Sequence, residues 1–145
     1  GTQEEKVLMS SSGASPAVDV SVLTNKYCDT LKLVPFDVKA KTAVEDMFAE
    51  GAIASMGGVD SPAATTFALF DLMAKVDFTY KIVGAGALKS VVTCTDYMEM
   101  KDGKSAMLEA VTILTFNGAG KIVRIDDISD PAEFAKIAKC LPLPG

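Results

Sequence analysis

The segment TFNGAGKIVRIDD, residues 115–127, decides how the rest of the sequence is interpreted. Two glycines and Lys121 stand between apolar residues, a composition typical of a phosphate-binding loop or of a tight turn. A Walker-type loop needs a glycine five residues before the Gly-Lys pair and Ser or Thr after it, but Thr115 and Ile122 stand there. A dinucleotide-binding loop needs a third glycine where the sequence has Val123. Because Asn-Gly between alternating segments is the strongest short-range hairpin signal, we predict a turn between two strands.

Length and charge limit the class of protein. The 145 residues fit one domain with a substantial core. The net charge of −5, from 14 basic and 19 acidic residues, and the lack of a basic cluster argue against nucleic-acid binding. No run of 18 apolar residues is present, so no membrane span is expected.

Cysteine and histidine usage limits the chemistry. Cys28, Cys94 and Cys140 lie far apart, which predicts neither a disulfide framework nor a metal site and favours a soluble protein in a reducing compartment. The chain has no histidine, so Ser-His and Cys-His nucleophiles are excluded. No cofactor motif is present, and we expect no cofactor.

The spacing of apolar residues changes along the chain from a helical period to a period of two. Residues 1–17 lack any period and are predicted to be a flexible arm, either a disordered tail or a segment that orders on a partner. Residues 18–140 form the predicted domain and residues 141–145 a short tail. We predict helices over residues 18–33, 38–51 and 61–75, a strand over 52–56, alternating strands over 77–83, 90–100, 105–116 and 121–129, and a last helix from Pro131 with a capping box of Asp130 and Glu133. Helices followed by a meander indicate an α+β fold.

Two short motifs carry a resemblance. FNGAGKIV, residues 116–123, follows a long alternating strand, and MFAEGA, residues 47–52, stands at the end of a predicted helix. In these motifs the chain resembles the ketosteroid-isomerase-like and polyketide-cyclase-like branch of the nuclear-transport-factor-two-like superfamily. The resemblance implies a cone-shaped, curved antiparallel sheet wrapped around the N-terminal helices, with an apolar pocket inside and often a dimer.

The catalytic residues of the isomerases carry over only in part. Their general base lies eight residues beyond the phenylalanine that matches Phe48, where this chain has Met56, which cannot accept a proton. Their second acid lies four residues before the phenylalanine that matches Phe116. This chain has Thr112 at that position, and its hydroxyl can still donate a hydrogen bond. The tyrosine of the first helix matches Tyr27. The resemblance therefore implies that isomerase activity by the family mechanism is lost.

Another carboxyl group can take the place of the missing base. If the last strand alternates regularly, Asp127 points into the cone, where an apolar environment would raise its pKa and suit acid–base chemistry. Alternatively, Asp127 lies solvated at the strand end or caps the next turn. Asp96 and Glu99 fall on opposite faces of one strand and are not expected to form a carboxylate pair. The predicted pocket is lined by Met56, Thr112, Leu114, Val123, Ile125 and Asp127.

The strand over residues 105–116 is apolar on both faces. Its outer face carries Met107, Val111 and Ile113, and a monomer rarely leaves such a patch in water. We therefore expect self-association, as a dimer, or docking on a protein partner through this face.

Two functions remain open. The favoured interpretation is a non-catalytic pocketed domain that binds ligands or partners, as an accessory subunit of a larger assembly. The alternative is a small isomerase, dehydratase or cyclase that acts on an apolar ring or polyketide-like substrate, with Asp127 as base or acid and Thr112 and Tyr27 as hydrogen-bond donors. A fold alone does not decide between them.

Overall fold

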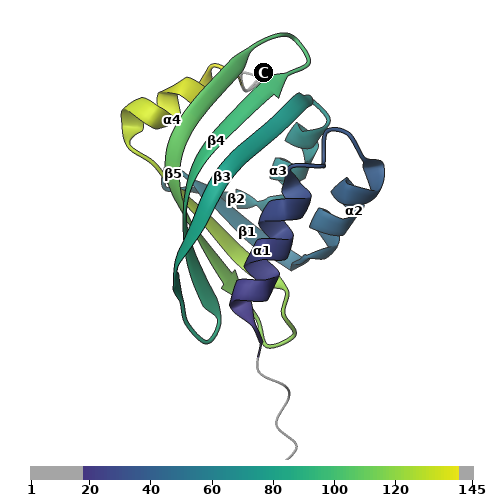
Figure 1. The fold of residues 1–145 in the computed structure, drawn as a ribbon, viewed down its shortest axis with the longest axis vertical. Helices are drawn as coiled ribbons and strands as arrows, with labels where there is room; N and C mark the ends of the chain where they lie inside the picture. The colour runs from purple at the N-terminus through teal and green to yellow at the C-terminus, as the bar shows by residue number, and fades with distance from the viewer. Residues whose placement is uncertain (1–17, 141–145) are drawn as a thin grey trace, which may run out of the picture.

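The computed structural model describes residues 18–140, so the predicted arm and tail lie outside the described residues. Within this range, three helices lie on one side of a curved six-stranded sheet, and a fourth helix lies beside β5 (Figure 1). The strand order is β2-β1-β6-β5-β4-β3, and the sheet stays open because β2 and β3 do not pair. The predicted α+β cone is confirmed.

The first two helices begin where the sequence places capping acids. Helix α1, Val20–Leu31, is capped by Asp19, whose side chain accepts a hydrogen bond from the Val22 amide. Helix α2, Val38–Asp46, is capped in the same way by Asp37. Both helices are shorter than predicted, by about one turn in the case of α2.

The end of the second predicted helix is wrong, because residues 48–51 belong to a strand. Strand β1, Phe48–Met56, pairs with β6, and Phe48 lies opposite Ile122. A bulge follows, where Gly51 has a φ of +76° that favours glycine. Tertiary pairing of this segment with β6 therefore overrides its helical spacing.

The third helix also begins later and ends earlier than predicted. Ser61 and Pro62 are the last residues of strand β2, Val59–Pro62, which pairs with β1. This strand was not predicted from the sequence. Helix α3, Ala63–Phe70, has Pro62 as its N-cap residue, without a side-chain cap. The chain from Met73 onward is already a strand.

The second half of the domain is the predicted meander. Four strands follow one another along the chain, and each pairs antiparallel with the next. They are β3 (Met73–Ala85), β4 (Lys89–Met100), β5 (Ser105–Phe116) and β6 (Ile122–Ile128). The pairing of β1 with β6 is parallel and joins the N-terminal half to the meander.

Helix α4, Pro131–Ala138, is capped by Asp130, which accepts a hydrogen bond from the Ala132 amide. The predicted capping box does not close. The Glu133 carboxylate instead accepts a hydrogen bond of 3.0 Å from the backbone amide of Glu109 on β5. Strand β6 pairs with β5 only from Val111 onward, so Glu133 contacts the part of β5 that lies beyond this pairing.

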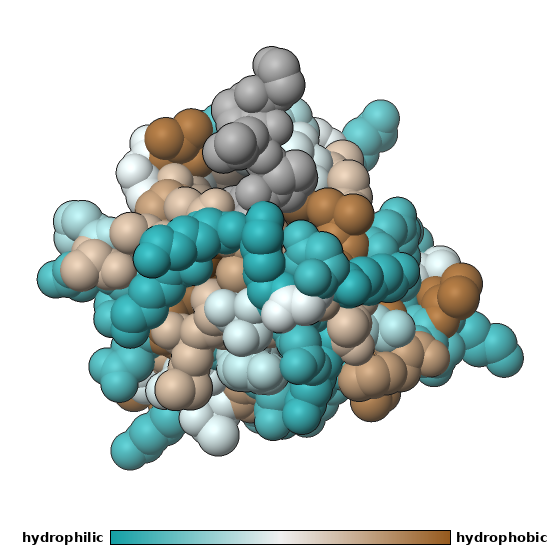
Figure 2. Space-filling view, turned by 90° about the horizontal axis from the view of Figure 1, so that it is seen from above, coloured by the Kyte–Doolittle hydropathy of each residue, from teal (hydrophilic) through white to brown (hydrophobic). Residues whose placement is uncertain are grey.

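The core lies between the helices and the inner face of the sheet. Its largest fully buried side chains include Leu114, Ile122 and Val44. At the end of the molecule that is uppermost in Figure 1, the surface is mostly hydrophilic, with hydrophobic residues scattered among polar ones (Figure 2). The cavity described next lies in the apolar interior of the cone.

Candidate functional site

A cavity of about 150 Å³ lies inside the cone. Its walls come from α1, α3, α4 and the inner faces of the strands. Side chains directly opposite each other on neighbouring strands point to the same side, so Tyr80, Cys94 and Ala110 mark the inner face of three strands. The apolar wall includes Leu31, Phe70, Met73, Phe78, Met98 and Ile137.

Asp127 and Thr112 form the best-defined polar contact of the cavity. They lie opposite each other on β6 and β5, and the Thr112 hydroxyl donates a hydrogen bond of 2.8 Å to Asp127 Oδ1. Burial raises the pKa of Asp127 to about 6, and the negative charges of Asp96 and Asp126 act in the same direction. The bond from Thr112 partly opposes this rise. Asp127 is surrounded by protein but keeps part of its surface open, because it lines the cavity.

A second carboxyl group, Asp96 on β4, lines the same cavity. Burial also raises its pKa, and Cys94 opposes the rise. Cys94 lies between the two acids, with its Sγ 3.8 Å from the Thr112 hydroxyl. Burial raises the pKa of the Cys94 thiol to about 12, which leaves it protonated and unreactive at neutral pH.

Tyr27 supplies a phenol hydroxyl to the cavity from α1. The side chain is buried, with 9% of its surface exposed, and its ring packs edge-on against Phe48 at a centroid distance of 5.9 Å. Burial, followed by the charge of Asp127, raises the pKa of Tyr27 well above its usual range, so the hydroxyl keeps its proton. Within residues 18–140 no partner accepts a hydrogen bond from it, which leaves this donor available to a ligand.

The structure brings most of the predicted pocket residues to one place. Met56, Thr112, Leu114, Ile125 and Asp127 all line the cavity. Val123 does not, because a bulge in the pairing of β5 with β6 turns Ile122 inward, where it lies opposite Phe116. Regular alternation, counted back from Asp127, could not reveal this bulge.

Asp96 is the site residue that sequence reasoning missed. The alternation of β4 already placed Asp96 on the same face as Val92 and Cys94, and this pattern could have identified it as a site residue. Glu99, the partner considered for it, lies on the other face. Its actual companion, Asp127, is 31 positions away, and only the fold brings the two into one cavity.

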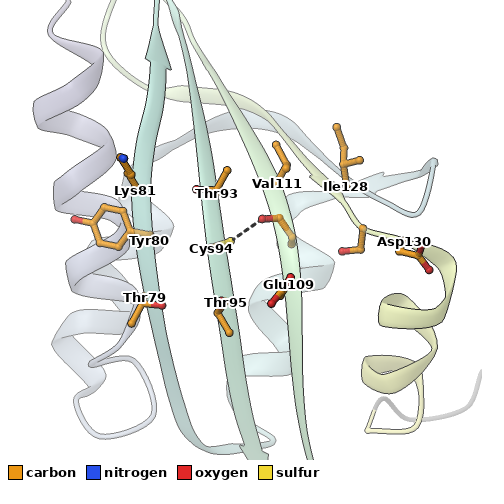
Figure 3. Close-up of a pocket in the computed structure, with 12 residues that line it drawn as sticks. Thr79, Tyr80, Lys81, Thr93, Cys94, Thr95, Glu109, Val111, Ile128 and Asp130 are labelled. Carbon is orange, nitrogen blue, oxygen red and sulfur yellow. Dashed lines mark hydrogen bonds between the residues drawn. The ribbon is translucent and has the colours of Figure 1, made fainter.

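The outer face of the sheet holds a second, shallow groove (Figure 3). Its floor is formed by hydroxyl and charged side chains, among them Lys81, Thr93 and Glu109. The predicted interface residues belong to this face: Met107 is 58% exposed, while Val111 and Ile113 are half-buried.

Residues 18–140 contain neither a metal site nor a membrane-spanning helix. No group of three or more cysteine or acidic side chains there is arranged to hold a metal ion. No helix in the same range is long and apolar enough to cross a membrane.

No protein-family profile and no protein of curated function matches the sequence. Solved structures do match. An NTF2-like protein of unknown function from Exiguobacterium sp. 255-15 has a TM-score of 0.64 at 17% identity, covering 75% of this chain and 98% of that one. The epoxide hydrolase/cyclase-like enzyme SalBIII, with a role in pyran ring formation in polyether salinomycin, has a TM-score of 0.62 at 17% identity, with coverages of 79% and 95%. The Δ5-3-ketosteroid isomerase from Mycobacterium sp. has a TM-score of 0.62 at 10% identity, also with coverages of 79% and 95%. The chain therefore has the NTF2-like fold, which isomerases and cyclase-like enzymes share, and the predicted resemblance is confirmed at the level of the fold.

Proposed function

We propose that this protein is a small acid–base enzyme of isomerase, dehydratase or cyclase type that binds a small, mostly apolar ring substrate in the cavity. The hydrogen bond from Thr112 to Asp127 inside an apolar cavity is the observation that carries this proposal. A site that only holds apolar molecules gains nothing from a buried carboxyl group, because desolvation of the charge costs free energy. Strongly perturbed carboxyl groups in clefts point instead to chemistry.

The three polar groups take different roles. With a pKa of about 6, Asp127 is mostly ionised at pH 7 and accepts a proton from a substrate C–H bond. The electron pair of that bond moves toward a substrate oxygen, which Tyr27 stabilises by donating its hydroxyl hydrogen. Returning the proton to a second carbon completes an isomerisation. Thr112 is a positioning residue, because its single hydrogen is already directed at Asp127.

The test compares two neighbouring carboxyl groups. Wild-type protein, D127N and D126N are incubated in D₂O with a panel of single-ring β,γ-unsaturated ketones, tertiary alcohols and hydroxy-epoxides, and products are followed by mass spectrometry. Asp126 bonds to Arg124 on the other face of β6, so D126N is a matched control. We expect turnover of at least one substrate, reduced about 100-fold in D127N and unchanged in D126N. No turnover by the wild type, or equal turnover by D127N, contradicts the proposal.

A second candidate is the non-catalytic interaction domain, acting as an accessory subunit through the outer sheet face. The exposed Met107 side chain beside Val111 and Ile113 favours it, and the partner tested first is a second copy of the chain. Sedimentation velocity at micromolar concentration compares the wild type with M107E. V22E is the control, because Val22 is equally exposed, at 60%, but lies on α1. Dimers that only M107E dissociates support this function, and a wild-type monomer argues against self-association.

A further inference from the structure

Asp96 is a half-buried carboxyl group with little polar support. In the sheet it lies between Phe78 on β3 and Leu108 on β5, and its side chain faces the cavity. Among residues 18–140, the group that lowers its pKa is the Cys94 thiol, a weak donor whose Sγ also lies 3.6 Å from the Ala110 carbonyl oxygen. Asp127, by contrast, has the Thr112 hydroxyl. Polar groups enclosed in folded proteins almost always have partners, and of the two carboxyl groups in the cavity Asp96 is the one without a hydroxyl or amide partner.

The cavity also lacks a positive charge. Two carboxyl groups line it, yet none of the lining residues is lysine or arginine. The charges that act on Asp127 come from Asp96 and Asp126, which are both negative. Lys32 places its Nζ 5.6 Å from the ring centroid of Phe78, and Lys75 places its Nζ 5.8 Å from that of Tyr97, but within residues 18–140 neither forms an ion pair with Asp96. Buried charges are normally paired, so the described residues leave a place for a cation.

The remaining walls suit a small ring. A cavity of about 150 Å³ is the size known to accommodate one benzene molecule, and is too small for four fused rings. Aromatic side chains from α1, α3 and β3 line it, and the face of an aromatic ring attracts a cation. Tyr27, which is nine-tenths buried, lines the same space, and its hydroxyl has no acceptor among residues 18–140.

We infer that Asp96 is the binding site for the charged nitrogen of a single-ring primary amine, whose ring occupies the apolar part of the cavity. The inference rests on the proposed function in one respect, namely that the substrate also carries the C–H bond and the oxygen on which Asp127 and Tyr27 act. Asp96 binds the ammonium group and Asp127 remains free for proton transfer. The cavity therefore discriminates by charge, and favours an ammonium ligand over a neutral one and a neutral ligand over an anion.

The expected pH dependence follows from the same charges. Asp96 must be ionised to bind an ammonium group, and its pKa is raised in the empty cavity. The titratable groups that line the cavity with it are Tyr27 and Cys28 on α1, Tyr80 on β3, Cys94 and Tyr97 on β4, and Asp127 on β6. Tyr27, Tyr80 and the two cysteines keep their protons at neutral pH, because burial raises the pKa of each. Amine binding should therefore weaken as the pH falls from 7.5 to 4.5, whereas binding of a neutral ring should not change.

The experiment uses three probes with one ring: cyclohexylamine, cyclohexanol and cyclohexanecarboxylate. Dissociation constants are measured by calorimetry, or by ligand-observed NMR for weak binding, on the full chain. At pH 7.5 we expect the amine to bind at least tenfold more tightly than the alcohol, and the acid not to bind. In D96N the amine should lose tenfold or more in affinity while the alcohol stays within twofold. Equal affinities for amine and alcohol, or an unchanged amine affinity in D96N, overturn the inference.

Two safeguards keep the result interpretable. If D96N does not fold, D127N decides, because Asp127 also loses its charge in this pH range. Amine affinity that no longer falls toward pH 4.5 in D127N overturns the inference. Turnover tests the role of Asp127, whereas binding tests the role of Asp96. Amine binding without turnover rejects the proposed function alone, and turnover without an amine preference rejects this inference alone.

Discussion

Thr24 on α1 and Ser90 on β4 share a hydrogen bond of 2.6 Å between hydroxyl groups of two fully buried side chains. The pair joins the first helix to the middle of the meander across 66 positions of sequence. Since α1 carries Tyr27, one turn further along, this contact also fixes where the phenol enters the cavity.

Removing both members of this pair should cost less stability than the two single removals added together. In T24V the Ser90 hydroxyl is left buried without its partner, which costs about 1–3 kcal/mol. The double variant T24V/S90A loses both groups together, so its free energy of unfolding should fall by less than the sum of the single changes. Urea unfolding of the wild type, T24V, S90A and T24V/S90A measures this double-mutant cycle. Strict additivity would show that the two hydroxyls do not depend on each other.

The stability of the protein should depend on pH through Asp127. Its pKa is about 6 in the folded protein and 3.8 in the reference state, so the folded state holds the proton more tightly. This stabilisation is complete below pH 3.8 and is lost as the pH rises through about 6. Relative to the wild type, D127N should therefore gain up to about 3 kcal/mol of unfolding free energy between pH 4 and pH 8, at about 1.4 kcal/mol per pH unit.

Urea unfolding at several pH values measures this difference. D126N again serves as the control, since Asp126 is bonded to Arg124 outside the cavity and should not show the same gain. A D127N curve that runs parallel to the wild-type curve from pH 4 to 8 would mean that Asp127 is not desolvated.

Thr112 should set the pH at which the proposed enzyme works. Its hydroxyl lowers the pKa of Asp127, so in T112V that pKa should rise further. The ascending limb of the pH–rate profile then moves to higher pH, and activity at pH 7 falls while much of it returns at pH 9. T115V, on the outer face of the same strand, should leave the profile in place. A uniform loss of activity at every pH would instead indicate a damaged cavity.

Gly57 should be the more sensitive of two neighbouring glycines. Both Gly57 and Gly58 have positive φ values, +59° and +82°, so alanine at either position costs about 1–2 kcal/mol in backbone strain. A Cβ at Gly57 would also lie 3.3 Å from the ring of Phe134 on α4, whereas one at Gly58 meets nothing within 4 Å. G57A should therefore lower the free energy of unfolding by about 1 kcal/mol more than G58A. Equal losses of unfolding free energy in G57A and G58A would show that the Phe134 ring moves aside without cost.

The sequence predicted those parts of the fold that depend on local spacing. Strand β5 and the turn before β6 follow from strict alternation and from the Asn-Gly pair. The predictions failed where pairing between distant segments decides. Residues 48–51 have helical spacing but pair with β6, and residues 59–62 resemble a helix start but form the short edge strand β2.

The candidate site divides in the same way. Asp127 and Thr112 were found because the hairpin motif fixes their inner face, and the structure adds the bond between them. The meeting of Asp96 with Asp127 depends on how three strands curve around one hollow, which no short sequence window contains. Val123 was misplaced by a single bulge.

The contact between Glu133 and the Glu109 amide holds α4 against the part of β5 that β6 does not cover. There one carboxylate takes the place of a neighbouring strand, and Ile137 of the helix packs with Leu108 and Ala110 of the strand in a buried apolar cluster. Separating α4 from the sheet would break no strand ladder but would expose this cluster, so α4 and the end of β5 should lose their protection from amide exchange together.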